Sequence, residues 1–184
     1  PGEYSAFAIG AIIVGAANYI AEGGIGASLV QRKDLLRSEI EVVSTWQYVM
    51  GVLTFAGIWA LAPHLSLFFN GDSNTANIIR TMGLVSLITS AGSVPQNLLR
   101  RKLDFRGIQI STISGMAIGY LLVGIPLAYF GFGAWSLALA WVSQSIASTS
   151  LLYYYARPPI GFRAWCSDGK TLIRFGVSAL VSNL

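Results

Sequence analysis

The chain has 184 residues, of which 54% are hydrophobic and only 11% are charged, and its mean hydropathy is +0.60. A typical soluble domain carries about 25% charged residues, so this composition excludes an ordinary soluble domain and favours a protein whose surface lies in lipid. The single cysteine, Cys166, and the single histidine, His64, exclude an intrachain disulfide and a cysteine-based metal site. We therefore expect no metal and no cofactor.

Five apolar stretches, each of about 20 residues or more, predict membrane-spanning helices. In chain order they cover residues 4–30, 42–62, 77–99, 107–130 and 134–156. Backbone groups in lipid must be hydrogen-bonded within the structure, and none of the stretches alternates with a period of two, so helices are expected and not a barrel. The predicted fold class is all-α integral membrane, an antiparallel transmembrane helix bundle.

The connections predict how these helices follow one another. Short turns, Asn70-Gly71-Asp72 and Gly131-Phe132-Gly133, require the helices that they join to be antiparallel neighbours. Pro95 is expected to kink or end the third helix. The chain starts at Pro1 and stops within a further apolar run at residues 171–184. We therefore expect residues 1–184 to be a fragment of one transmembrane domain, with a further helix beginning at its end.

Positive charge is unevenly distributed between the connections. Eleven of the twelve lysine and arginine residues follow the first, third or fifth predicted span, and Arg80 is the exception. Alternating spans place those three connections on one side of the bilayer, and an excess of positive charge marks the cytoplasmic side. The net charge of +4 thus reflects membrane topology, and no basic stripe on a soluble face indicates nucleic-acid binding.

Polar residues inside predicted spans are candidates for a transport pathway, because they are costly in lipid and usually face a cavity or a partner. Glu22 and Asn18 lie one turn apart on the first span, and Gln47 lies at a similar depth on the second. Together they predict a polar pocket in the cytoplasmic half of the bundle. The alternative is that Glu22 lies at the interface and pairs with Arg32 or Lys33.

Three further features also have two interpretations each. Arg80, near the outer end of the third span, is either a cavity residue or a side chain that extends to the outer headgroups. Gln144, in the fifth span, either lines the cavity or joins helices by a hydrogen bond. The run Arg100, Arg101 and Lys102 is first of all a topology signal, and it could also hold an anionic phosphate as a substrate enters.

Several sequence motifs occur in the order seen in one family of transporters. The chain resembles flippases of the O-antigen and teichoic-acid exporter type, in the multidrug/oligosaccharidyl-lipid/polysaccharide superfamily. Ser5 stands where that family often has glycine. The motifs are PGEYSAFA at 1–8, EGGIGASLVQRKDL at 22–35, FFNGD at 68–72, SVPQNLLRRKLDFR at 93–106, GFGAWSL at 131–137 and LIRFGVSAL at 172–180.

The resemblance implies a longer protein of two related helix bundles, of which this chain is most of the first. It also implies alternating access in a bacterial or archaeal cytoplasmic membrane. The expected substrate is a polyprenyl-pyrophosphate-linked glycan, and the expected partners are membrane lipids and other glycan-assembly proteins. None of the candidate residues matches a family position whose role can be carried over.

Two alternatives to this function remain open. A cation-coupled multidrug antiporter would share the superfamily fold, although the QRKDL and LRRKLDFR segments favour the sugar exporters. A membrane-bound polymerase or glycosyltransferase would need catalytic groups in a loop, and the predicted outer loops are too short to hold such a site. The chain shows no Ser-His-Asp set, paired acids or phosphate-binding glycine loop, so we expect no enzyme.

Overall fold

The computed structural model describes residues 2–22, 37–68 and 73–159, and within these ranges it contains helices and no strand. The predicted Asn70–Asp72 turn and the predicted helix at 171–184 lie outside the described residues. An all-α membrane fold is confirmed. The helices are α1 (Gly2–Glu22), α3 (Arg37–Phe68), α4 (Ser73–Arg101), α5 (Phe105–Met116), the π-helix η1 (Ala117–Gly124), α6 (Ile125–Tyr129) and α7 (Ala134–Ala156).

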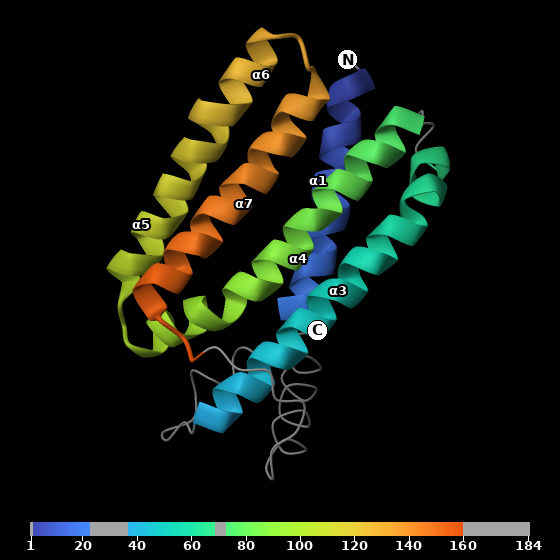
Figure 1. The fold of residues 1–184 in the computed structure, drawn as a ribbon. Coiled ribbons are helices and arrows are strands. Elements are labelled where there is room, and N and C mark those ends of the chain that lie inside the picture. The colour runs from blue at the N-terminus through green and yellow to red at the C-terminus, as the bar shows by residue number, and fades with distance from the viewer. Residues whose placement is uncertain (1, 23–36, 69–72, 160–184) are drawn as a thin grey trace.

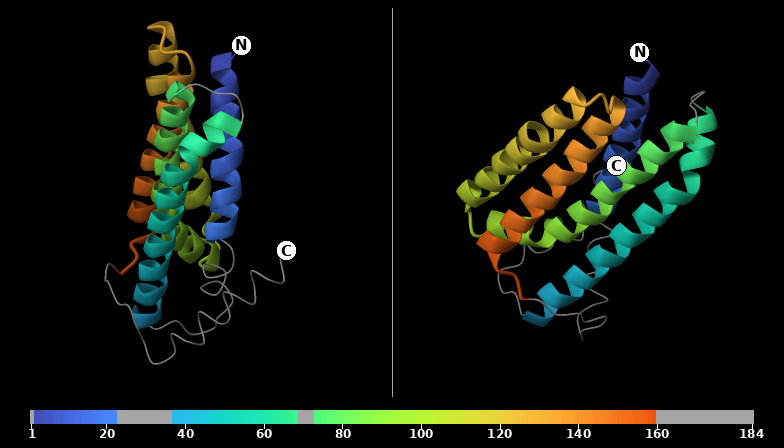
Figure 2. Two further views of the ribbon diagram at one scale, coloured as in Figure 1. Left: turned by 90° about the vertical axis from the view of Figure 1, so that its right-hand side faces the viewer. Right: turned by 45° about the horizontal axis from the view of Figure 1, so that its top comes forward.

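Four helical rods lie side by side in one row, and a fifth lies on one face of the row. The order across the row is α3, α4, α7 and then the continuous rod formed by α5, η1 and α6 (Figure 1). The remaining helix, α1, packs mainly against α4 (Figure 2). The helices α1 and α4 run in the same direction (Figure 1). The central helix α4 contacts α1, α3 and α7.

Three of the described helices are long and apolar enough to cross a membrane, namely Ile40–Phe68, Asn74–Arg101 and Phe105–Tyr129. In α1 the apolar stretch is shorter and covers Phe7–Asn18. With 23 residues, α7 has the length to cross about 30 Å of hydrocarbon. Its hydropathy is lowered by serine, threonine and glutamine side chains, many of which face neighbouring helices. The limits of the five predicted spans remain predictions.

Neither of the two prolines inside long helices ends its helix. Although Pro95 was expected to kink or end its helix, α4 continues for six residues beyond it to Arg101 and changes direction in its last turns (Figure 1). Similarly, α3 continues past Pro63 to Phe68 and changes direction near that end (Figure 2). A membrane helix tolerates proline where neighbouring groups bind the carbonyl that the proline leaves free.

The turn between α6 and α7 has the predicted form. Gly131 and Gly133 have φ angles of 82° and 54°, a left-handed region that glycine adopts without steric cost. The helices on either side of this turn are antiparallel neighbours, as predicted. The turn between α4 and α5 is equally short, yet α7 packs between those two helices along most of their length (Figure 1).

The main hydrophobic core lies where α1, α3, α4 and α7 meet. Its largest side chains come from α4: Ile78, Ile79 and Met82 are at most 1% exposed. Val14 of α1 and Ile58 of α3 pack against them. Truncating such a side chain to alanine typically costs about 2–5 kcal/mol of stability. This core therefore holds α4 firmly in place between α1, α3 and α7.

Candidate functional site

Gln47 is a buried polar residue whose side-chain amide has no partner in the described part of the chain. Its neighbours on the same face of α3 both pack on α4: Val43 contacts Val94, and a Cβ on Gly51 would lie 2.7 Å from Cβ of Ser90. The Gln47 side chain is 1% exposed, and neither Nε2 nor Oε1 has a hydrogen-bond partner among the described residues. Leaving a buried polar group unpaired costs about 1–3 kcal/mol, so this amide is stabilised only when something else binds it.

Asn18 reaches the same level of α4 from the other side. The Thr89 hydroxyl lies 3.4 Å from Asn18 Oδ1 and also 2.8 Å from the carbonyl oxygen of Val85. A hydroxyl has one proton to donate, and the shorter bond takes it, so the Asn18 amide is only weakly bound. Asn18 and Gln47 thus lie beside the same stretch of α4, residues 89–94, from two sides, and the polar pocket between them stays a prediction.

Glu22, the third member of that predicted pocket, is the last residue of α1, one helical turn beyond Asn18. Its side chain is outside the described part of the structure. The helix therefore brings the Glu22 backbone toward the same end of the bundle as Asn18, and the role of its carboxylate stays a prediction.

Buried serines of α4 complete a polar layer that the sequence analysis missed. Ser86, Ser90 and Ser93 are at most 3% exposed. Ser93 donates to the carbonyl of Ser90 at 3.0 Å, whereas the Ser86 hydroxyl has no partner within residues 2–22, 37–68 and 73–159. The only signal in the sequence was the spacing of these serines by three and four residues, which places them on one side of a helix. Hereafter, the polar layer means Asn18, Gln47, Ser86, Thr89, Ser90 and Ser93.

Two tyrosines tie α3 and α7 to α4 beside this layer. Pro95 has no amide hydrogen, so the carbonyl of Ala91, four residues earlier, lacks its helical partner. The Tyr153 hydroxyl donates to that carbonyl at 3.2 Å and also meets the Tyr48 hydroxyl. Because Tyr153 uses its proton on Ala91, Tyr48 is the donor between the two rings. We call this arrangement the tyrosine clasp.

Arg80 lies outside the polar layer. It is six residues before Ser86, the nearest member of the layer on α4, about 9 Å along the helix axis. Its guanidinium lies 5.2 Å from the ring centre of Trp59, and Nη1 donates to Asn77 Oδ1 at 3.4 Å. Nε is buried, and no residue that the structure describes binds it. The guanidinium therefore packs on the protein through a cation–π contact, at the opposite end of α4 from the basic run.

Gln144 lies on a different side of α7 from the residues that contact α4. A Cβ on Gly119 of η1 would lie 2.6 Å from Cβ of Gln144 and 2.5 Å from the carbonyl oxygen of Ala140. By contrast, Thr149 and Tyr153 direct their hydroxyls toward α4. The structure thus places Gln144 in the tight contact between α7 and η1, and it does not bring Gln144 to the polar layer.

The basic run lies at one end of the bundle with other cations. Arg100, Arg101 and Lys102 end α4 and begin the turn to α5, with Arg100 and Lys102 exposed. Of the seven lysines and arginines among the described residues, all but Arg80 lie at this end, where α3 begins, α4 ends, α5 begins and α7 ends (Figure 1). We call it the basic end.

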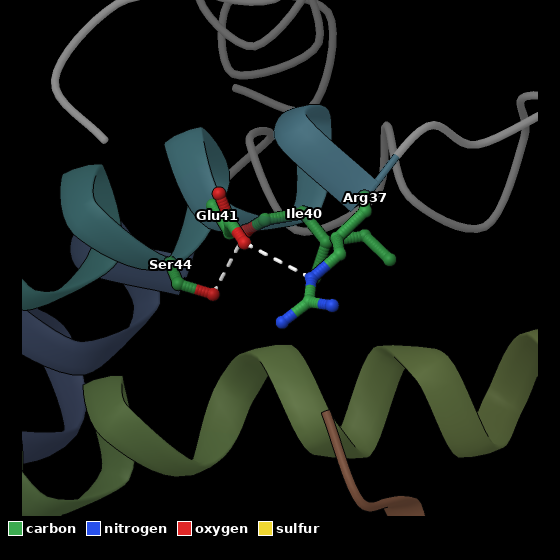
Figure 3. A network of polar contacts seen from close by, with 4 residues as sticks. All are labelled: Arg37, Ile40, Glu41 and Ser44. Carbon is green, nitrogen blue, oxygen red and sulfur yellow. Dashed lines mark hydrogen bonds and ion pairs between the residues drawn. The ribbon is translucent and has the colours of Figure 1, made fainter. Parts of the chain in front are cut away.

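One of these cations is paired within its own helix. Arg37 Nε lies 3.2 Å from Glu41 Oε1 in the first turns of α3 (Figure 3). In the next turn, the Ser44 hydroxyl donates to the carbonyl of Ile40 at 2.8 Å. The Arg37 side chain is 75% exposed, so the pair contributes little stability, but it partly neutralises this cation.

Together, these features define the class of protein: a multi-pass α-helical membrane protein with a polar layer between helices and positive charge at one end. The sequence model of the family described as "Polysaccharide biosynthesis protein" matches residues 1–184. The chain belongs to this family.

Individual relatives are distant but match most of the chain. The chain is 24% identical to the succinoglycan biosynthesis transport protein ExoT of Rhizobium meliloti (strain 1021) over 157 residues, 85% of this chain and 31% of the relative. It is 21% identical to the lipopolysaccharide biosynthesis protein WzxC of Escherichia coli (strain K12), over 84% of this chain and 31% of the relative.

A third relative is similar over a shorter part of the chain. The teichuronic acid biosynthesis protein TuaB of Bacillus subtilis (strain 168) is 24% identical over 59% of this chain and 23% of the relative. The chain thus spans less than a third of the length of each of these relatives. No solved structure matches it.

Proposed function

We propose that this chain is part of a transporter that moves a polyprenyl-pyrophosphate-linked glycan across a bacterial or archaeal cytoplasmic membrane by alternating access. The observation that carries the proposal is the family match over residues 1–184, because one relative is named as a transport protein and two others for making envelope polysaccharides. In this proposal the chain is not an enzyme, and it works with the rest of the transporter and with glycan-assembly proteins.

The polar layer supplies groups that suit a sugar substrate. Hydroxyl-rich sugars both donate and accept hydrogen bonds, as the amides of Gln47 and Asn18 also do. In the described conformation Gln47 is shut between α3 and α4, so it meets a substrate when these helices separate. Glu22, one turn from Asn18, adds a carboxylate to the same pathway. Arg80, which packs on Trp59, and Gln144, which packs against η1, would contact the substrate at other depths, and only when these contacts open.

The basic end suits the other half of the substrate. A pyrophosphate carries negative charge, and the planar guanidinium of arginine binds two phosphate oxygens at once. Arg100, Arg101 and Lys102 lie where α4 emerges from the membrane, so they would meet a pyrophosphate headgroup before its glycan reaches the polar layer.

The test of transport uses the full-length protein in a strain that lacks its gene. We expect lipid-linked glycan to accumulate in that strain and export to return with the wild-type gene. Glu22→Gln should restore export only in part while the protein reaches the membrane normally. Normal export without the gene would contradict the proposal. Altered drug sensitivity with normal export would favour an antiporter, and altered glycan length a polymerase.

Gln47→Leu separates a role in transport from a role in folding. Leucine has a similar volume and no polar atoms. The free energy of unfolding of the purified protein should therefore stay equal or rise by about 1–3 kcal/mol, while export falls. Gln109→Leu is the matched control, because Gln109 is an exposed amide on α5 and its replacement should leave export unchanged. A destabilised Gln47→Leu protein, or one that exports normally, would remove Gln47 from the pathway.

Arg101→Lys separates phosphate binding from topology. Lysine keeps the charge that orients the helices but loses the planar guanidinium. We expect normal insertion and orientation together with reduced export. If Arg101→Lys exports normally and Arg101→Ala only lowers the amount inserted, the basic run acts in topology alone.

A further inference from the structure

The turn between α4 and α5 has an unusual backbone for its sequence. Leu103 lies in the left-handed region with a φ of 56°, which costs a branched, bulky residue conformational energy that glycine or asparagine would avoid. Two backbone bonds fix this geometry: Leu103 N–H donates to the carbonyl of Arg100, and Asp104 N–H to that of Leu99, both at 3.0 Å. Leucine at this position therefore needs a reason other than the turn itself.

Packing within the described part of the protein does not explain why this turn has apolar side chains. Leu103 is 74% exposed and Phe105 is 56% exposed, so neither contributes to the core. Exposed cations flank them, namely Lys102 before and Arg106 after. The turn thus displays two apolar groups between positive charges.

Asp104, the acidic residue of the turn, is held at the start of α5. Asp104 Oδ1 accepts a hydrogen bond from Gly107 N–H at 3.0 Å and caps the start of α5. A carboxylate in this position interacts with the positive end of the helix dipole. The Asp104 carboxylate keeps its negative charge, but with the two cations Lys102 and Arg106 beside it the turn still carries a net positive charge that can attract another anion.

We propose that the α4–α5 turn anchors the protein to anionic phospholipids, with Leu103 and Phe105 entering the boundary between headgroups and acyl chains while Lys102 and Arg106 bind lipid phosphates. The position of the turn identifies the occupant. One candidate span ends at Arg101 and the next begins at Phe105, so the turn emerges at the membrane surface, where apolar and basic side chains bind anionic lipid together. The anchor shares Lys102 with the pyrophosphate-binding role proposed above, and the displacement experiment below separates the two.

The experiment compares variants of the full-length protein in nanodiscs containing equal amounts of phosphatidylcholine and phosphatidylglycerol. Native mass spectrometry measures how strongly phosphatidylglycerol is enriched among the lipids that remain bound. Leu103→Asn removes the apolar group but tolerates the left-handed backbone, and Arg106→Gln removes one charge. We expect enrichment to fall roughly fivefold for Arg106→Gln and further in the double variant.

Arg37→Gln is the matched control, since it removes an arginine at the same end that is already paired with Glu41. It should change the enrichment less than twofold. A second readout places a bimane dye on Leu103→Cys in a cysteine-free protein, and brominated phosphatidylglycerol should quench it. Equal losses for Arg37→Gln and Arg106→Gln, or an unquenched dye, would overturn the proposal.

Two further outcomes would also overturn the anchor. If a long-chain isoprenyl pyrophosphate displaces the bound phosphatidylglycerol, the site belongs to the substrate phosphate. If Arg106→Gln inverts the orientation of the helices in cells, the charge acts as a topology signal. Unchanged orientation together with undisplaced phosphatidylglycerol would support the anchor.

Discussion

Tyr153 links a helix defect to the packing of three helices. Its hydroxyl binds the Ala91 carbonyl that Pro95 leaves free and holds Tyr48 in turn. A free carbonyl inside a membrane bundle is costly because no water reaches it. The clasp therefore lets α4 carry a proline, and a change of direction, without an unpaired backbone group.

Replacing Tyr153 with phenylalanine should destabilise the protein by about 1–2 kcal/mol, because the Ala91 carbonyl is left unpaired. Tyr48→Phe should cost less, since Tyr153 still binds Ala91. Thermal unfolding of the purified full-length protein measures both. Pro95→Ala supplies the control: it gives residue 95 an amide hydrogen that can bond the Ala91 carbonyl, so Tyr153→Phe should cost less in that background. Equal costs in both backgrounds would show that the tyrosine does not serve the proline.

The rod formed by α5, η1 and α6 depends on a change of helical period. Gly119 and Gly124 are five residues apart, yet a Cβ on either would approach Ala140 of α7, at 2.5 Å from its carbonyl oxygen and 3.1 Å from its Cβ respectively. A π-helix brings residues five apart onto one face, so η1 keeps both glycines against α7. Where η1 ends, Ile125 N–H donates to the carbonyl of Tyr120, five residues earlier.

Gly119→Ala should weaken the packing of η1 on α7, because the added methyl group meets backbone atoms that cannot rotate away. We expect a loss of about 1–3 kcal/mol, measured as a lower melting temperature. Gly57→Ala in α3 is the control, since a Cβ there meets nothing within 4 Å and alanine favours a helix by about 0.5–1 kcal/mol over glycine. A Gly119→Ala protein as stable as the wild type would contradict the close contact.

At the scale of the whole molecule, the two ends of the bundle differ in charge. Six of the seven described cations lie at the basic end, whereas the Gly131–Gly133 turn at the other end is uncharged. Positive charge is retained on the cytoplasmic side during insertion. The basic end is therefore expected in the cytoplasm and the α6–α7 turn outside.

This orientation can be tested by labelling intact cells. In a cysteine-free full-length protein, a cysteine replacing the exposed Phe132 should react with a membrane-impermeant thiol reagent, and one replacing Lys102 should react only after the cells are opened. Both positions are exposed in turns, so access to the reagent and not burial decides the result. The reverse pattern would place the basic end outside the cell. A substrate that enters from the cytoplasm would then not meet the basic end before the polar layer.

Much of the architecture was predictable because it depends on the hydrophobicity and the charge of short stretches of chain. Apolar runs of about 20 residues specify membrane helices wherever they fold, while the direction that the loop charges predict stays a prediction. The Gly131–Gly133 turn was also predictable, because it depends only on the residues of the turn itself. For the same reason, the polar residues Asn18 and Gln47 could be placed at a common depth from their positions in the helices alone.

Only the tertiary structure decided which helices touch. The sequence gives no sign that α7 packs between α4 and α5, that Tyr153 binds the carbonyl freed by Pro95, or that Gln144 faces η1 and not the polar layer. Each of these contacts joins residues distant in the chain, and in lipid every helix is apolar on most sides. Hydrophobicity therefore does not choose between faces, and the choice depends on the close fit of small residues and on hydrogen bonds between helices.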